Sequence, residues 1–79
     1  ARKWNMPKTA SGGKGVKILT KHFGFFFVSQ KGSHVKLKKY TVRGTVMTVV
    51  PMHRELARGT LRGVLELAGI DIREFRKFL

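Results

Sequence analysis

The stretch Ser33-His34-Val35-Lys36-Leu37-Lys38-Lys39-Tyr40 alternates between apolar and polar side chains, and this alternation is the main indication of the fold. Successive side chains of a β-strand point to opposite faces of a sheet, so Val35 and Leu37 are predicted to face a core. The opposite face is predicted to carry His34, Lys36, Lys38 and Tyr40. This strand therefore predicts a sheet with one buried face and one basic, solvent-exposed face.

Two further strands are predicted on either side of this stretch. Residues 25–30 are apolar and aromatic, and they lead into Lys31-Gly32, a pair typical of a tight turn. After a second turn at residues 42–44, residues 45–50 are rich in β-branched side chains and end at Pro51, which lacks the N–H that a sheet needs. The three strands are predicted to form an antiparallel meander.

A helix is predicted ahead of the strands, from Gly12 to Gly24. Its apolar face is predicted to hold Val16, Leu19 and Phe23, which follow helical spacing. Gly13 and Gly15 each cost about 1 kcal/mol relative to alanine inside a helix. The first turn of this helix is therefore predicted to fray or to begin late.

The pattern changes to helical spacing again after Pro51. Thr60 is predicted to be the N-cap of the main helix, and Gly69 is predicted to end it. The apolar face between them consists of Leu61, Val64, Leu65 and Ala68. Asp71 and Glu74 resemble a capping box that opens a short last helix.

The predicted fold class is α+β. The elements form an α-β-β-β-α two-layer domain, a three-stranded antiparallel sheet with helices on one face, plus a short C-terminal helix. Residues 1–11 show no periodicity and are predicted to be a loose basic N-terminal segment, while residues 12–79 are predicted to form a single domain.

The charge of the chain predicts a polyanionic partner. Its 79 residues include 17 Lys and Arg against four acids, for a net charge of +13. Residues 1–54 carry twelve basic residues and no acid (+12), and the remainder carries five basic minus four acidic residues (+1). Phosphate contacts from Lys and Arg dominate nucleic-acid affinity, so nucleic acid is favoured. A membrane surface or an acidic protein remains an alternative.

Several classes of protein are disfavoured by what the sequence lacks. There is no cysteine, which is typical of a reducing cytoplasm, and no apolar run approaches the roughly 18 residues of a membrane span. Gly12-Gly13-Lys14-Gly15 lacks the strand and the hydroxyl residue of a phosphate-binding loop. The three histidines have no carboxylate companions nearby, so neither a metal nor a cofactor is predicted.

His34 is the candidate for chemistry on a phosphodiester. RNA supplies its own nucleophile, the 2′-hydroxyl, so a nuclease needs a base for that proton and positive charge for the phosphate. Lys31, Lys36 and Lys38 would hold the phosphate and disfavour a protonated imidazole at His34. On the residues alone, a histidine in a basic strand is more often a phosphate or solvent contact than a catalyst.

Three blocks of the sequence carry a resemblance to a known family. They are Gln30-Lys31-Gly32-Ser33-His34-Val35-Lys36-Leu37, then Val49-Val50-Pro51-Met52-His53-Arg54-Glu55-Leu56, and then Gly59-Thr60-Leu61-Arg62 with Ala68-Gly69-Ile70. Over residues 11–78 the chain resembles the HicA family of toxins. The glycines of its first helix depart from the family pattern, which usually has acidic and helix-forming residues there.

The resemblance implies a fold, an activity and a partner. HicA toxins are mRNA interferases of toxin–antitoxin pairs, with a fold similar to the double-stranded RNA-binding domain. The histidine of the Gly-Ser-His block is the catalytic residue of the family, which implies catalysis by His34. The resemblance also implies ribosome-independent cleavage of mRNA, growth arrest, and inhibition by a cognate HicB-type antitoxin. A non-catalytic RNA-binding module remains the alternative.

Other residues are expected to assist. Arg54, Arg58 and Arg62 flank the start of the main helix, where backbone N–H groups also favour phosphate, and are predicted to bind RNA or to remain solvated. Ser33 is predicted to bind RNA beside the histidine, and His53 is a candidate assisting acid.

Residues 25–27 are three phenylalanines predicted to be mostly core, with Phe26 or a neighbour left exposed to bind a partner or bases. Trp4 and Tyr40 are further stacking candidates.

Overall fold

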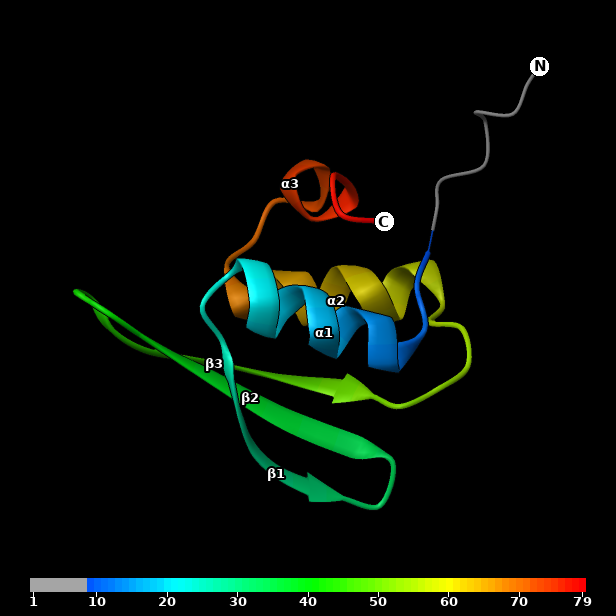
Figure 1. Ribbon diagram of the computed structural model, residues 1–79, viewed down its shortest axis with the longest axis horizontal. Coiled ribbons are helices and arrows are strands. Elements are labelled where there is room, and N and C mark those ends of the chain that lie inside the picture. Colours follow the sequence, from blue (N-terminus) through cyan, green and yellow to red (C-terminus); the bar gives the residue numbers. More distant parts are fainter. Residues whose placement is uncertain (1–8) are drawn as a thin grey trace.

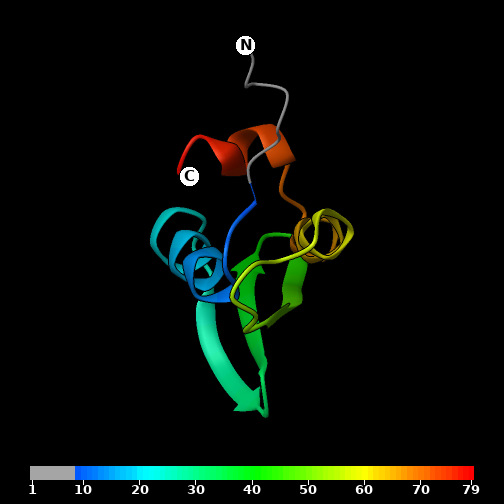
Figure 2. The same cartoon turned by 90° about the vertical axis from the view of Figure 1, so that its right-hand side faces the viewer.

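The computed structural model describes residues 9–79 and confirms the predicted α+β fold. Its elements in chain order are α1 (Gly12–His22), β1 (Phe26–Lys31), β2 (His34–Thr41), β3 (Gly44–Pro51), α2 (Arg58–Ala68) and α3 (Ile72–Arg76). Figure 1 shows α1 and α2 lying together over one side of the sheet, with α3 on the far side of this helix pair. Figure 2 shows the same layers from the end of the sheet.

The sheet is an antiparallel meander with β2 in the centre. The alternation that predicts its two faces is confirmed, because Val35 and Leu37 are buried while His34 and Tyr40 are exposed. The pairing of β1 with β2 shifts between Phe27 and Ser29, which leaves Val28 as the extra residue of a bulge in this edge strand.

The core lies between the sheet and the helices and continues up to α3. Its fully buried large side chains come from every layer: Leu19, Leu37, Val50, Leu56, Leu65 and Phe75. One polar side chain is buried with them, since the hydroxyl of Thr48 in β3 donates to the carbonyl oxygen of Val64 in α2 at 2.8 Å. This bond satisfies the buried hydroxyl and fixes α2 on the sheet.

The first turn of α1 is well formed, contrary to the prediction that its glycines make it fray. The hydroxyl oxygen of Ser11 caps the helix by accepting the backbone N–H of Lys14 at 3.0 Å. Gly12 is buried, and a Cβ there would collide with the carbonyl oxygen of Pro51 and lie 2.7 Å from the Cα of Met52. The absence of a side chain therefore lets α1 pack directly on the end of β3.

The apolar face of α1 also differs from its prediction. Ile18 and Leu19 are buried, whereas Val16 and Phe23 are only partly buried against the core. The prediction omitted Ile18 because it followed a single line of spacing, while the helix packs on the sheet and its C-terminal end also contacts the ring of Phe78, after α3. The face in contact with the core is therefore wider than one row of side chains.

The predicted N-cap of α2 is wrong. The helix begins at Arg58, its N-cap is Ala57, and no side chain caps it, so Thr60 lies inside the first turn. Leu56 is buried immediately before the cap, and its N–H donates to the carbonyl oxygen of Ala10 at 2.8 Å. This tertiary anchor sets the start of the helix and overrides the local preference of Thr60. Gly69 ends α2 in the left-handed conformation, as predicted.

The two ends of the described chain are held against the domain. At the N-terminal end Ala10 is buried, and the hydroxyl of Thr9 donates to the carboxylate of Glu55 at 3.0 Å. Residues 1–8 of the predicted loose segment lie outside the described residues. At the C-terminal end Asp71 caps α3 as predicted, by accepting the N–H of Arg73 at 2.7 Å.

Candidate nucleic-acid interface

His34 is the first residue of β2 and lies exposed at the end of the sheet. Its cross-strand partner in β1 is Lys31, and its cross-strand partner in β3 is Pro51. Residues paired in an antiparallel sheet point to the same face, with Cβ atoms about 5 Å apart. His34 and Lys31 therefore share the face of the sheet that the helices leave uncovered.

The loop between β3 and α2 is hydrogen-bonded both to this end of the sheet and to the start of α1. The N–H of Met52 donates to the carbonyl oxygen of Ser33, and the carbonyl oxygen of His53 accepts the N–H of Gly12 at 2.9 Å. The side chain of His53 is exposed at the same end of the molecule. Two backbone bonds thus place the predicted assisting acid in the loop that borders His34.

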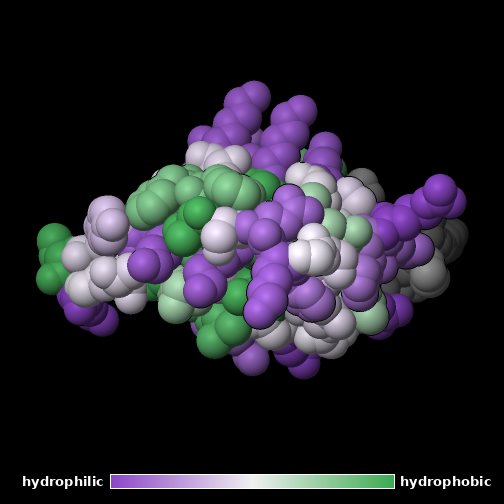
Figure 3. Space-filling view, turned by 90° about the horizontal axis from the view of Figure 1, so that it is seen from below, coloured by the Kyte–Doolittle hydropathy of each residue, from purple (hydrophilic) through white to green (hydrophobic). Residues whose placement is uncertain are grey.

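Lys36 and Lys38 continue the row that begins at His34 on the outer face of β2. Their partners in β3 are Val49 and Met47, which are also partly exposed. Both lysines are half-buried, as is usual where the carbon chain of a lysine covers apolar surface and its ammonium group stays in water. In Figure 3, which looks onto this side of the molecule, hydrophobic side chains lie directly beside hydrophilic ones.

Phenylalanines 25 to 27 divide between three environments, so the prediction that they are mostly core is wrong, while the expected exposure of Phe26 is confirmed. Only Phe25 is buried. Phe26 is paired with Lys38 on the outer face, where its ring lies 5.2 Å from the ring of Tyr40 between centroids. Phe27 is paired with Leu37 on the helix-facing side, but at the sheet edge it extends beyond the helices and stays 56% exposed.

The predicted arginines fall on two surfaces. Arg54 follows His53 within the loop, and Arg58 is the first residue of α2. Figure 1 places the start of α2 at the same end of the molecule as the β1–β2 turn. Arg62 instead lies one turn further along, in a groove of about 460 Å³ between α2 and α3 that Arg58 also lines. Because the sheet and α3 lie on opposite sides of the helix pair, Arg62 does not share the face of His34.

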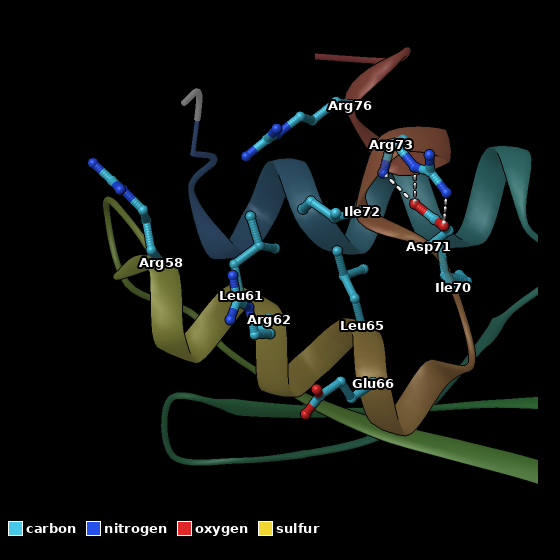
Figure 4. A pocket seen from close by; sticks show the side chains of 10 residues that line it. All are labelled: Arg58, Leu61, Arg62, Leu65, Glu66, Ile70, Asp71, Ile72, Arg73 and Arg76. Carbon is cyan, nitrogen blue, oxygen red and sulfur yellow. Dashed lines mark hydrogen bonds and ion pairs between the residues drawn. The ribbon is translucent and has the colours of Figure 1, made fainter. Parts of the chain in front are cut away.

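The groove contains two arginines that sequence reasoning missed. Arg73 and Arg76 line it from α3, across from Leu61 and Leu65 of α2 (Figure 4). Their spacing of three residues in the last helix was the available signal, because residues so spaced share a helical face.

The four acidic residues all lie outside the sheet, and two of them form ion pairs near α3. Asp71 pairs with Arg73 at 3.0 Å, and Glu74 pairs with Lys77 at 3.3 Å, both in the α3 region. Hydrogen bonds from the side chain and the backbone N–H of Arg73 lower the pKa of Asp71 from 3.8 to about 2. Since residues 26–51 contain no Asp or Glu, nothing in the sheet itself neutralises its lysines.

Residues 9–79 contain neither a cluster of metal-ligating side chains nor a membrane-spanning helix. No three His, Cys, Asp or Glu side chains in this part of the chain gather as they would around a metal ion. None of the helices described is both long and apolar enough to cross a membrane.

Comparison with known proteins gives one family. The model of the family described as the HicA toxin of bacterial toxin–antitoxin systems matches residues 14–70. This range includes the β1–β2 hairpin, the loop after β3 and all of α2. A search of curated proteins gives no match to the chain.

Proposed function

The chain belongs to the HicA toxin family of bacterial toxin–antitoxin systems, and on this premise we propose that it is a metal-independent endoribonuclease that cleaves mRNA with His34 as the catalytic residue. A toxin of such a system has an antitoxin as its partner. The observation that carries the proposal is the position of His34, exposed at the end of β2 and directly across the hairpin from Lys31.

The proposed reaction needs one base and one nearby cation. Neutral His34 takes the proton of a ribose 2′-hydroxyl, and the 2′-oxygen attacks the adjacent phosphorus. Lys31 stabilises the negative charge that develops on the phosphate oxygens. The bond from phosphorus to the 5′-oxygen breaks, and that oxygen takes up a proton. The products are a 2′,3′-cyclic phosphate and a free 5′-hydroxyl.

His53 is our candidate for the group that protonates the leaving 5′-oxygen. The backbone bonds of residues 52 and 53 to Ser33 and Gly12 support this assignment, because they hold the loop beside His34. Ser33, which adjoins His34 and sits in the turn, is proposed to bind the phosphate. A lysine or water is the alternative donor, so the effect of His53→Ala on the rate decides between them.

The remaining basic residues are proposed to position the RNA. Lys36 and Lys38 extend the cationic row from His34 along β2, and Arg54 and Arg58 lie at the same end of the molecule as His34. Arg62 shares the groove between α2 and α3, so its proposed phosphate contact belongs to RNA that passes around the start of α2. These contacts orient the strand without reading its sequence.

We propose a HicB-type antitoxin as the cognate inhibitor. The same basic face that would hold RNA would attract an acidic protein surface, and a protein covering His34 would stop cleavage. With mRNA as its substrate, the toxin would act in the cytoplasm.

The test uses purified protein and a single-stranded RNA in EDTA. We expect cleavage with 2′,3′-cyclic phosphate ends, and we expect a 2′-deoxy substitution at the cleaved position to block it. A non-catalytic RNA-binding module would bind this RNA and leave its length unchanged. Cleavage that persists at the 2′-deoxy position would contradict the 2′-hydroxyl mechanism.

A further inference from the structure

The outer face of the sheet carries a pair of aromatic rings that the core does not use. Phe26 is 39% exposed and Tyr40 is 72% exposed, and their ring centroids lie 5.2 Å apart. The planes are inclined by 50°, so the two rings are not stacked on each other, and both remain accessible. An exposed aromatic pair on an open sheet is a surface that flat, apolar groups can cover.

Positive charge surrounds this pair. Lys38 is the partner of Phe26 across the sheet, so the two side chains share one face, and Lys36 follows on that face toward His34. The whole sheet, residues 26–51, contains no acidic residue. Flat apolar groups attached to regularly spaced negative charges therefore match this face in both shape and charge.

The aromatic pair and His34 lie on the same face of the sheet, at different points along β2. Lys38, the partner of Phe26, lies four positions along β2 from His34, and Tyr40 lies six positions from it. At about 3.3 Å per residue, the rings lie roughly 13 to 20 Å from His34, with Lys36 and Lys38 in between. A chain lying along β2 would reach the rings, the lysines and the histidine in that order.

We propose that Phe26 and Tyr40 form a stacking platform for the bases of single-stranded RNA, a few nucleotides away from the bond that His34 cleaves. This inference rests on the proposed ribonuclease function and specifies how the substrate is held. Bases of a single strand are free to stack on aromatic side chains, whereas bases inside a duplex are covered by their neighbours. The platform therefore selects unpaired RNA, with little dependence on sequence.

The test measures binding separately from cleavage. In the full chain with His34→Ala, we would measure the dissociation constant of a fluorescein-labelled polyuridine of about 12 nucleotides, at fixed salt. The test variants are Phe26→Leu and Tyr40→Leu. Phe27→Leu is the matched control, because it removes another exposed ring from the strand of Phe26 but from the opposite face.

We expect each test variant to weaken binding by roughly 5- to 100-fold, the range that loss of one stacked base produces. Phe27→Leu should change binding less than two-fold on this scale, and Phe26→Tyr, which keeps a ring, should restore affinity. A duplex RNA of equal length should bind all the variants alike. Thermal unfolding should be unchanged, because neither ring is buried.

Other outcomes would overturn the platform. If Phe26→Leu and Tyr40→Leu bind polyuridine as tightly as the parent does, the rings do not stack on RNA. If these variants keep RNA but lose the antitoxin, the face is a protein-binding surface instead. Either result leaves the cleavage proposal standing, whereas a chain that binds through the rings but never cuts RNA would refute only the ribonuclease function.

Discussion

Gly12 shows how a single residue connects the fold with the candidate site. It is buried where α1 meets the end of β3, and its N–H donates to the carbonyl oxygen of His53. Any side chain at this position would push against the backbone of Pro51 and Met52. Because Met52 in turn is bonded to Ser33, a displacement there would be transmitted to the start of β2 beside His34.

A Gly12→Ala variant should therefore lose stability, by about 1–3 kcal/mol, as overpacked sites do. Gly13→Ala is the matched control, since its Cβ would come no closer than 3.8 Å to the end of the Met52 side chain. That variant should be neutral or up to about 1 kcal/mol more stable, because alanine favours the helix. Urea unfolding measures both, and equal stabilities for the two variants would refute the close approach at Gly12.

Single residues were predictable where a local pattern decides their environment. The alternation in β2 was enough to separate Val35 and Leu37 from His34. The role of Gly12 was not predictable, because helix propensity describes only the glycine and the close approach comes from Pro51, far away in the sequence. The role of His34 in catalysis stays a prediction.

At the scale of elements, ends fixed by local bonds were predictable and ends fixed by tertiary contacts were not. Gly69 and Asp71 end α2 and begin α3 where the sequence indicates, through backbone geometry and a side-chain cap. The start of α2 was missed because buried Leu56 and its bond to Ala10 determine it. The exposure of Phe27 was missed for a similar reason, since the length of the helices over the sheet is a tertiary property.

The cap of α3 predicts a pH dependence. The pKa of Asp71 in the folded chain is about 2, below its ordinary 3.8, so its charge stabilises the fold above that ordinary value. This contribution is lost as the pH falls toward 2. The thermal midpoint of Asp71→Asn, which keeps a capping oxygen, should thus lie below that of the parent at about pH 5 and converge with it at about pH 2.

Glu66→Gln is the control for this titration. Glu66 is exposed and forms no ion pair among residues 9–79, so its replacement should leave the midpoint difference flat over the same range. An Asp71→Asn difference that stays constant from pH 5 to pH 2 would show that the carboxylate charge does not hold α3.

At the scale of the whole molecule, the excess of positive charge was predictable from composition, but its division was not. Lys36 and Lys38 of β2 lie on the open face of the sheet, while Arg62, Arg73 and Arg76 line the groove between α2 and α3. Spacing along the chain does not indicate which side of the helix pair an α2 side chain will face. That depends on where α3 docks.

This division predicts which residues set the salt dependence of RNA binding. Each phosphate contact to a single strand contributes about 0.7 to the slope of log affinity against log salt. Changing Lys36 and Lys38 together to glutamine should reduce that slope by about 1.4 if each lysine binds one phosphate. Lys77→Gln, which alters a lysine paired with Glu74 on α3, should leave the slope unchanged. Equal slopes for all these proteins would place the RNA elsewhere.

The central claim is that His34 cleaves RNA, and the most direct measurement is the cleavage rate of the purified His34→Ala variant in EDTA. His34 is exposed, so the variant should keep the fold, as circular dichroism and thermal unfolding would verify. We expect RNA cleavage to fall to background while RNA binding is retained. A folded His34→Ala variant that cuts RNA at the parental rate would contradict a catalytic role for His34.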